Sequence, residues 1–466
     1  MKRKSILNLI VLSVMLLLIF SCNKQEIQKE NKTISEFFKE GDRVAFVGNS
    51  ITHMGMFHHN IYLYHITRFP DKPLEMYNSG VSGDVTTGVL NRMEDDILLN
   101  KPTVAVIMLG MNDVQRHLYG NENDSDKEIL KQRKQAVDLY KKNLDSIVNI
   151  FLARDIKVIL ERPSIYDQTA SLPATNLTGV NDVLGECAVF IDSLGKKYNL
   201  PVVDYYTIMN RINTEIQKTN PSATLTGADR IHPGETGHLI MAYQFLKTEK
   251  VPEHVSKIVI DAQKLQIKSE SENCKIGDLL KKDNTLEFRV DEKALPFPLI
   301  KEQQEAVKLV PFVSELNVEL LKITGLPKGN YSLKIDETDI DTFSAAQLNS
   351  GINLSEYNTP QLLQAKKVRK KMDELWSMED KLRGMKFIEY MDDYKACPDK
   401  KNLKVVENFL DSVFNKYSDP YYKDQLRIYL QNKPKENELL SKCAGIRKEI
   451  YDLATPEPHI FKLILK

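Results

Sequence analysis

Ser50 is the first residue whose surroundings suggest chemistry, because it ends the segment Gly48-Asn49-Ser50 directly after a short apolar run at residues 44–47. A serine just past the carboxyl end of a buried strand, behind a glycine that permits a tight turn, is well placed to act as a nucleophile. The tripeptide is common, however, and a serine there often only caps a helix. Ser50 alone therefore does not establish catalysis.

A carboxylate and an imidazole stand three residues apart at Asp229 and His232. On a turn, this spacing can bring the carboxylate to the imidazole, where it fixes the tautomer and stabilises the imidazolium that forms in catalysis. Combined with Ser50, the pair would provide the three side chains of a serine hydrolase.

Two other segments contain groups that could stabilise a developing oxyanion. Residues 78–84 include two glycines, which let a ligand approach the backbone, and the amide of Gly83 could donate to the oxyanion. We interpret these residues as a loop, and a turn before a helix is the alternative. The second segment, residues 109–113, follows an apolar run, and the side-chain amide of Asn112 could point into the same cleft.

These four blocks, in this order, resemble the SGNH (GDSL-type) hydrolase superfamily, whose pattern has a Gly-Asp-Ser block, a glycine block, a Gly-x-Asn-Asp block and an Asp-x-x-His block. The resemblance implies that Ser50 is the nucleophile, His232 the general base and Asp229 its orienting partner. It also implies an oxyanion hole formed by the amides of Ser50 and Gly83 and by the side chain of Asn112.

One residue departs from the family pattern, since Asn49 stands where the family has the aspartate of Gly-Asp-Ser. Asparagine keeps the shape and most of the hydrogen bonds, so we expect activity to be retained. The segment also differs from the Gly-x-Ser-x-Gly turn of α/β-hydrolases, because Thr52 replaces the second glycine. The resemblance spans roughly residues 40–250, under half of the chain.

The resemblance implies an esterase that forms an acyl-enzyme and needs no metal or other cofactor. His232, Glu235 and His238 lie close in sequence, but their spacing is not the His-Glu-x-x-His of zinc proteases. We favour an O-acyl ester, chiefly an acetyl ester, of a glycan or small molecule as the substrate. The alternatives are a lysophospholipase-like or other short-chain lipid esterase, and a non-catalytic glycan-binding surface lipoprotein.

The elements that must position these residues alternate between apolar runs and amphipathic stretches from about residue 41 to 250. Helical spacing of apolar residues recurs at residues 137–151 and 183–194. The alternation predicts an α/β fold, a parallel sheet with helices on both faces in the three-layer, flavodoxin-like arrangement of SGNH hydrolases. Ligands of such sheets bind beyond the carboxyl ends of the strands. The expected strands are residues 44–47, 103–109, 156–160 and 201–204.

The pattern changes near residue 250. Short strands separated by turns predict a smaller β-rich, antiparallel accessory domain at residues 251–345. Thr359-Pro360 then predicts the start of a helix and a helical region over residues 346–466. Nothing after residue 250 combines a second nucleophile with a base, so we expect this half to shape access to Ser50. The apolar, proline-stiffened residues 295–299 could pack on the hydrolase domain, residues 36–250, or wall its cleft.

The N-terminal residues predict export. A basic start, an apolar run and then Ser21-Cys22 resemble a bacterial lipoprotein signal, with residues 1–21 as signal peptide and Cys22 as the lipidated residue. Residues 22–35 are polar and read as a tether. The protein would then be attached to the bacterial cell envelope by a lipid at Cys22, in the outer membrane, the periplasm or on the surface. An ordinary signal peptide or an uncleaved anchor is the alternative.

The overall charge argues against a nucleic-acid partner. The 466 residues include 64 basic and 64 acidic side chains, so the formal net charge is zero. This balance lacks the basic face that nucleic-acid binding requires, and we predict no nucleic-acid partner.

The remaining cysteines and histidines give weaker expectations. None of the cysteines forms a CxxC pair, and Cys397 with Cys443 is the favoured disulfide, with four buried thiols as the alternative. We expect the histidines that follow Ser50 at the surface or the rim of the site, with His58 or His59 in reach of substrate. The residues concerned are Cys187, Cys274, Cys397 and Cys443, and His53, His58, His59 and His65.

Overall fold

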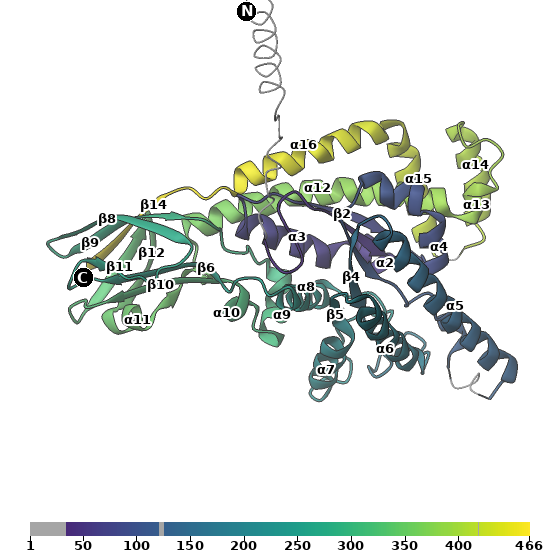
Figure 1. Ribbon diagram of the computed structural model, residues 1–466, viewed down its shortest axis with the longest axis horizontal. Helices are drawn as coiled ribbons and strands as arrows, with labels where there is room; N and C mark the ends of the chain where they lie inside the picture. Colours follow the sequence, from purple (N-terminus) through teal and green to yellow (C-terminus); the bar gives the residue numbers. More distant parts are fainter. Residues whose placement is uncertain (1–33, 121–124, 418) are drawn as a thin grey trace, which may run out of the picture.

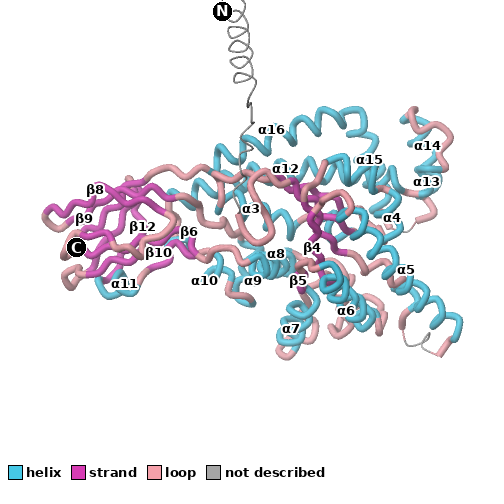
Figure 2. Tube along the Cα trace, in the orientation of Figure 1, coloured by secondary structure: helices cyan, strands magenta, loops and turns pink. Residues whose placement is uncertain are grey.

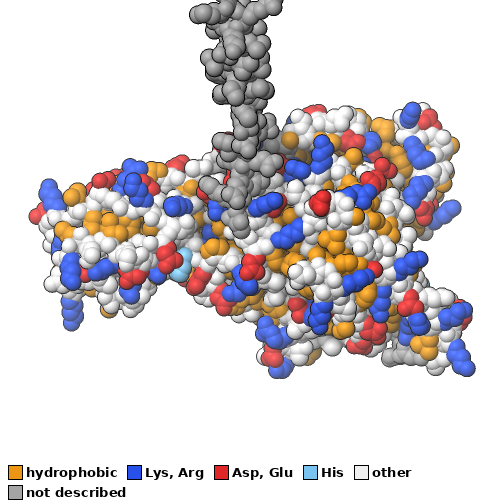
Figure 3. All heavy atoms as spheres, in the orientation of Figure 1, with side chains coloured by type: hydrophobic (Ala, Val, Ile, Leu, Met, Phe, Trp, Pro, Cys, Tyr) orange, Lys and Arg blue, Asp and Glu red, His pale blue; other side chains and the backbone are white. Residues whose placement is uncertain are grey.

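The computed structural model describes residues 34–120, 125–417 and 419–466. Figure 1 shows an α/β body, long C-terminal helices that run along it, and a β domain at one end. In Figure 2 the strands gather in two separate places, one inside the α/β body and one in the β domain. The side chains on the face in Figure 3 carry both signs of charge in mixture, as the zero net charge implies.

The α/β body is built on a five-stranded parallel sheet with the order β2-β1-β3-β4-β5. The predicted parallel sheet is therefore confirmed. The strands are β1 (Arg43–Gly48), β2 (Glu75–Gly80), β3 (Val104–Met108), β4 (Lys157–Arg162) and β5 (Val202–Asp204). Every residue of β3 is buried, because helices cover both faces.

Each face of the sheet has its own layer of helices and its own hydrophobic core. One face packs against α3 (Met56–Arg68), α7 (Tyr205–Gln217) and α8 (Glu235–Glu249). The other packs against α4 (Thr86–Asn91), α5 (Lys127–Leu152) and α6 (Val180–Tyr198). The apolar positions that predicted α5 and α6 are the buried faces of these helices.

The β domain consists of two sheets around a third hydrophobic core. Its β-rich, largely antiparallel character is confirmed, and one pair of neighbouring strands, β6 and β10, is parallel. Parallel neighbours need a crossover, and the chain between β6 and β10 runs through β7 to β9 and then through α9 (Gln304–Leu309) and α10 (Phe312–Leu316). The sheets have the orders β13-β10-β6-β7 and β12-β11-β14-β9-β8. Their strands are β6 (His254–Asp261), β7 (Gln266–Ile267), β8 (Cys274–Lys282), β9 (Thr285–Glu292), β10 (Val318–Thr324), β11 (Asn330–Ile335), β12 (Thr338–Ser344), β13 (Ile352–Asn353) and β14 (His459–Leu465).

The predicted boundary between the β domain and the helical region differs from the structure at the end of the chain. Residues 346–466 are mostly helical, as expected, but β14 returns to the β domain and lies between β11 and β9. It pairs antiparallel with both neighbours and contributes Phe461 and Leu463 to their core.

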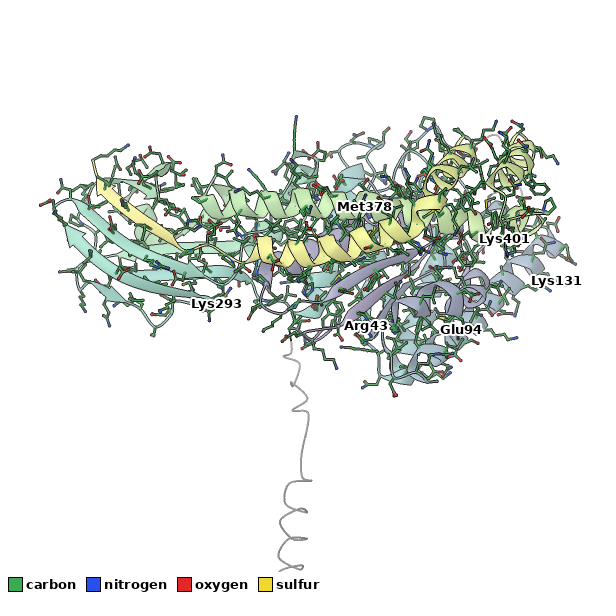
Figure 4. All side chains as sticks on the ribbon, turned by 90° about the horizontal axis from the view of Figure 1, so that it is seen from above. Arg43, Glu94, Lys131, Lys293, Met378 and Lys401 are labelled. Carbon is green, nitrogen blue, oxygen red and sulfur yellow. The ribbon has the colours of Figure 1, made fainter. Side chains whose placement is uncertain are left out.

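The C-terminal helices pack on the α/β body. Helix α12 begins where Thr359-Pro360 predicts, and the Thr359 hydroxyl accepts a hydrogen bond from Leu362 N at 3.1 Å. Helices α12 and α16 run side by side (Figure 4) and share a core with α3 and α8. The helices are α12 (Pro360–Tyr390), α13 (Asp392–Lys395), α14 (Leu403–Phe414), α15 (Tyr421–Asn432) and α16 (Glu436–Ala454).

The predicted disulfide is wrong. The four cysteines in the described part of the chain are free, and three are buried, Cys274 being partly exposed. Cys397 packs in a cluster around α14 and α15, whereas Cys443 on α16 packs in the core shared with α3. Because the two thiols belong to different cores, their pairing would require one helix to move.

The segment at residues 295–299 packs on the α/β body. The backbone N–H of Leu295 donates to Thr67 O at 2.8 Å, and Leu295 and Phe297 are buried in the core that contains α3.

The predicted signal peptide, Cys22 and most of the tether lie outside the described residues. The last two residues assigned to the tether belong to the fold, since Ile34 is buried and the Ser35 hydroxyl donates to the buried carboxylate of Glu249. None of the described helices is both long enough and apolar enough to span a bilayer.

Candidate active site

Ser50 is the first residue of α2 (Ser50–Met54), directly beyond the carboxyl end of β1. Asn49 caps this helix, and its side-chain oxygen accepts a hydrogen bond from Ile51 N at 3.2 Å. The turn is tight, because a Cβ on Gly48 would lie 2.1 Å from the hydroxyl of Thr52. As the first helical residue, Ser50 has an N–H with no acceptor inside the helix, so this N–H is available to a ligand.

His232 and Asp229 come from the loop between α7 and α8, and the structure brings both to Ser50. The Ser50 Oγ lies 2.7 Å from His232 Nε2, and His232 Nδ1 lies 2.5 Å from Asp229 Oδ2. These distances fit an Nδ1–H that donates to the carboxylate, which leaves Nε2 to accept the serine proton.

Asp229 is held as an anion. Partial burial would raise its pKa, but hydrogen bonds from the His232 ring and from the backbone N–H groups of Ile231 and His232 lower it to about 2. The guanidinium of Arg230 fixes the loop, because it donates to four backbone carbonyls in residues 167–174. The carboxylate therefore keeps one orientation toward the imidazole.

The oxyanion candidates lie on the loops after β2 and β3, the two strands that flank β1. Gly83 adopts a φ of 79°, in a turn closed by a 3.1 Å hydrogen bond from Asp84 N to Val81 O. Among the described residues no hydrogen bond engages the Gly83 amide, and a Cβ there would meet nothing within 4 Å. The side-chain nitrogen of Asn112 donates to Asp84 O at 3.0 Å, so the two loops are joined.

Residues 78–80 are not part of the predicted loop. They are the end of β2, where a Cβ on Gly80 would lie 2.3 Å from His53 N. The prediction failed because Glu75–Gly80 is a polar edge strand, without the apolar run that identifies a central strand.

Comparison with known proteins leads to the family that the sequence motifs resemble. Residues 46–240 match the model of the GDSL-like Lipase/Acylhydrolase family. The solved structure of a gut microbial diltiazem-metabolizing enzyme is 32% identical and covers 93% of this chain and 100% of its own, with a TM-score of 0.84. The chain belongs to the GDSL-type acylhydrolases. It is thus a hydrolase that acts on ester bonds.

Two further relatives of this GDSL-type esterase are shorter. The acetylxylan esterase of Geobacillus stearothermophilus is 25% identical over 222 residues, which are 44% of this chain and 93% of the relative. The solved structure of Axe2, an acetylxylan esterase from the same organism, is 24% identical and covers 45% of this chain and 95% of its own, with a TM-score of 0.37. These relatives match less than half of the chain, whereas the gut enzyme also matches most of the remainder.

A buried ion network that sequence reasoning missed contacts residues 81–84, which we call the oxyanion loop after the candidate donor Gly83. Arg92 donates to Asp84 and Asp96 at 2.7 Å each, and Arg383 on α12 makes two 2.8 Å hydrogen bonds to Asp96. Burial would raise the pKa of Asp96, but Arg383 and Arg92 lower it below its ordinary value. Arg383 Nε also donates to Gly80 O at 2.8 Å.

The histidines near Ser50 are not at the rim, and this prediction is wrong. His53, His58, His59 and His65 are all buried, because α2 and α3 lie between the sheet and the C-terminal helices. Burial, the largest cause, lowers the pKa of His53, His58 and His59 to about 3, so these rings are neutral.

The three residues weighed as metal ligands do not converge. His238 is fully buried beside Phe57, whereas Glu235 begins α8 and His232 faces Ser50. Within the described residues, no three His, Cys, Asp or Glu side chains are grouped so as to hold a metal ion.

Proposed function

We propose that this esterase hydrolyses an O-acetyl ester on a carbohydrate through an acyl-enzyme formed on Ser50. The observation that carries the proposal is the continuous hydrogen-bonded series from Asp229 through His232 to Ser50. As Ser50 Oγ attacks the acyl carbon, His232 Nε2 accepts the hydroxyl proton, and the Asp229 carboxylate stabilises the imidazolium. His232 then returns that proton to the leaving alcohol. Water repeats the sequence to release acetate and free Ser50.

The tetrahedral intermediate would be stabilised by the amides of Ser50 and Gly83 and by the side chain of Asn112. The unengaged Gly83 amide supports this role, because a preorganised donor costs no rearrangement at the moment of reaction. One N–H of the Asn112 side chain is used on Asp84 O, which leaves its second N–H for the oxyanion.

The choice of an acetylated carbohydrate rests on the similarity to an acetylxylan esterase, whose own length is 93% covered. A short-chain lipid ester is the competing substrate, and diltiazem is a third that the name of the gut enzyme suggests.

One set of assays tests both the mechanism and the substrate. Wild-type protein should hydrolyse p-nitrophenyl acetate and react with a fluorophosphonate probe, and Ser50→Ala should do neither while it keeps its circular dichroism spectrum. Acetylated xylo-oligosaccharides should then exceed short-chain acylglycerols, lysophospholipids and diltiazem in kcat/KM. Equal probe labelling of Ser50→Ala would overturn the mechanism, and faster turnover of a lipid would overturn the substrate.

We also propose that the protein is exported and attached to the bacterial envelope through a lipid on Cys22. The basic start, the apolar run and the cysteine at its end support this proposal. The wild-type protein should fractionate with membranes and carry lipid, and Cys22→Ser should remain unprocessed or become soluble. A wild-type mature protein that is soluble and free of lipid would refute it.

A further inference from the structure

A cavity of about 620 Å³ lies between the oxyanion loop and the C-terminal helices. Ser82, Gly83 and Asp84 line one side together with α4. The opposite side is formed by the end of α12, by α13 and by two tyrosines that precede or begin α15. The cavity therefore exists only because the C-terminal helices stand against the loop.

The lining of this cavity suits a sugar. Tyr417 and Tyr422 stack with ring centroids 4.5 Å apart, and the Tyr417 hydroxyl donates to Asp393 at 2.9 Å. Phe387 and Tyr390 of α12 add two further rings. Aromatic faces next to carboxylates can contact the apolar face of a pyranose ring while the carboxylates accept hydrogen bonds from its hydroxyls.

We propose that this cavity is the subsite for the saccharide that carries the acetyl group. The inference rests on the proposed function, because Gly83 both lines the cavity and would donate to the oxyanion. Ser50 does not line the cavity, so the acetyl group of a sugar bound there would extend past Gly83 to reach it. Binding energy from the sugar would then orient the ester toward Ser50.

The test compares substrates with and without a sugar in Tyr390→Ala, Tyr390→Phe and a control, Tyr198→Ala, on α6 outside the cavity. The ratio of kcat/KM for acetylated xylo-oligosaccharides to that for p-nitrophenyl acetate should fall about tenfold in Tyr390→Ala. It should stay near wild type in Tyr390→Phe and in the control. An unchanged ratio in Tyr390→Ala would overturn the subsite. A wild-type enzyme without activity on any acetylated saccharide would instead overturn the proposed substrate.

Hydrogen bonds from the C-terminal helices carry a second, independent inference about the same loop. Arg383 holds Gly80 O directly, and it reaches Asp84 through Asp96 and Arg92. Between these points the Tyr421 hydroxyl, on α15, donates to Ser82 Oγ at 2.8 Å.

The residues that accept these hydrogen bonds lie on both sides of Gly83 in the sequence. Gly80 ends β2, Ser82 and Asp84 follow it on the loop, and Gly83 lies between these two. Ser82 is also fixed from inside the α/β body, because His53 Nδ1 lies 2.9 Å from its hydroxyl and accepts its N–H at 3.2 Å. Movement of the Gly83 amide thus requires at least one of these contacts to break.

We infer that Arg383 and Tyr421 are positioning residues that set the direction of the Gly83 amide. Neither residue touches the reacting atoms in this mechanism. Their loss should lower kcat with little change in KM, since an oxyanion contact is made in the transition state and not by the bound ester.

Tyr421→Phe is the mildest test, because it removes a single hydroxyl. With p-nitrophenyl acetate as substrate, kcat should fall about tenfold and KM should not change. The fall is smaller than the ~10²-fold cost of moving a catalytic group by 1 Å. The matched control is Tyr429→Phe, which removes a buried hydroxyl from the same helix. Among the described residues this hydroxyl is hydrogen-bonded to Tyr394 alone. Rates are divided by the concentration of fluorophosphonate-reactive sites, so that unfolded protein does not lower the apparent kcat.

Arg383 provides the second arm of this test. Arg383→Lys keeps the charge and should recover part of the kcat that Arg383→Met loses, at equal reactive fractions. The inference would fail if Tyr421→Phe and Tyr429→Phe had the same kcat. It would also fail if the Arg383 variants had a smaller fraction of fluorophosphonate-reactive protein but an unchanged kcat per reactive site, because the residues would then have a structural role.

Discussion

The C-terminal helices and the β domain both follow the α/β body in sequence, yet they are attached to it in different ways. The helices share their core with α3 and α8, and Arg383 donates a hydrogen bond to Gly80 O at the end of β2. The β domain encloses a core of its own and meets the body at a junction. There the buried guanidinium of Arg68, on α3, donates to the carbonyls of Pro252, His254 and Leu316.

This difference shows that the hydrolase unit is larger than the segment that carries the motifs. The motif-bearing segment ends near residue 240, but α12 and α16 complete its core from more than a hundred residues away. The C-terminal helices also enclose a cluster around α14 and α15, but α12 and α16 share a core with α3, whereas the core of the β domain is formed by its own residues. The β domain is therefore the late region that resembles an accessory module.

The largest expected effect comes from removal of residues 251–466. Without α12 and α16 one face of α3 would be exposed to water, and Asp96 would lose Arg383. We therefore expect an insoluble or unfolded product without activity on p-nitrophenyl acetate. This reverses the expectation from sequence that the late half only shapes access. Circular dichroism and esterase assays check it, and a folded, active truncation would show that the helices are dispensable.

Loss of Asn112, a proposed oxyanion donor, gives the fall in kcat with which the effects of the helix variants are compared. Asn112→Ala should lower kcat on p-nitrophenyl acetate by about 10²–10³, the usual cost of one such donor. A rise in KM alone would make Asn112 a substrate-binding residue instead. Because Arg383 and Tyr421 act through the loop, their variants should lose less than Asn112→Ala does.

The comparison also predicts a small effect from damage to the β domain. Removal of residues 457–466 takes away β14, the middle strand of its five-stranded sheet, with the buried Phe461 and Leu463. The β domain should unfold at a lower temperature, while kcat on p-nitrophenyl acetate stays at the wild-type value. Differential scanning calorimetry and kinetics measure the two separately. A large loss of kcat would mean that the two late regions do not differ as described.

The smallest expected difference between the α/β body with its helices and the β domain is in the loss of stability at acidic pH. The folded pKa of about 3 in His53, His58, His59 and His238 lies below the ordinary value of about 6.5 in an unfolded chain. Between these values the unfolded state binds more protons, so stability falls as pH falls, by up to about 1.4 kcal/mol per pH unit for each ring. The α/β body and its helices should therefore weaken below about pH 6.5.

Trp376, the only tryptophan of the chain, reports on this loss of stability because its ring stacks on that of His59, with ring centroids 4.5 Å apart. Its fluorescence should show unfolding midpoints in urea that fall from pH 7 to pH 5, and His59→Gln should reduce the slope. A midpoint that does not change over this range would contradict the prediction.

Sequence could predict the central strands and the motif residues because their signals are local. Residues 44–47 form an apolar run that ends in a glycine, and Ser50 follows at once. The edge strand β2 lacks such a run and was missed. The burial of the histidines cannot be predicted from the local sequence, because it depends on α12 and α16, which are distant in sequence.

The sequence contains an indication that Arg383 is buried. The apolar stripe of α12 passes through Met372 and Leu375, and steps of four residues from Leu375 lead to Glu379 and Arg383, both buried. A charged side chain on the buried stripe of a helix needs a partner. The sequence could therefore have indicated that Arg383 has a buried partner, but not that the partner is Asp96.

The central place of β14 has a consequence for the order in which the β domain folds. β9 ends at Glu292 and its neighbour β14 begins at His459, so the sheet cannot close until the intervening helices have been synthesised. Pairing across such a span closes a long loop, which is slow unless other structure brings the ends together. Docking of α12 and α16 on the α/β body shortens that loop. Until then the edges of β9 and β11 stay open, and these edges are where misfolding and association between chains would begin.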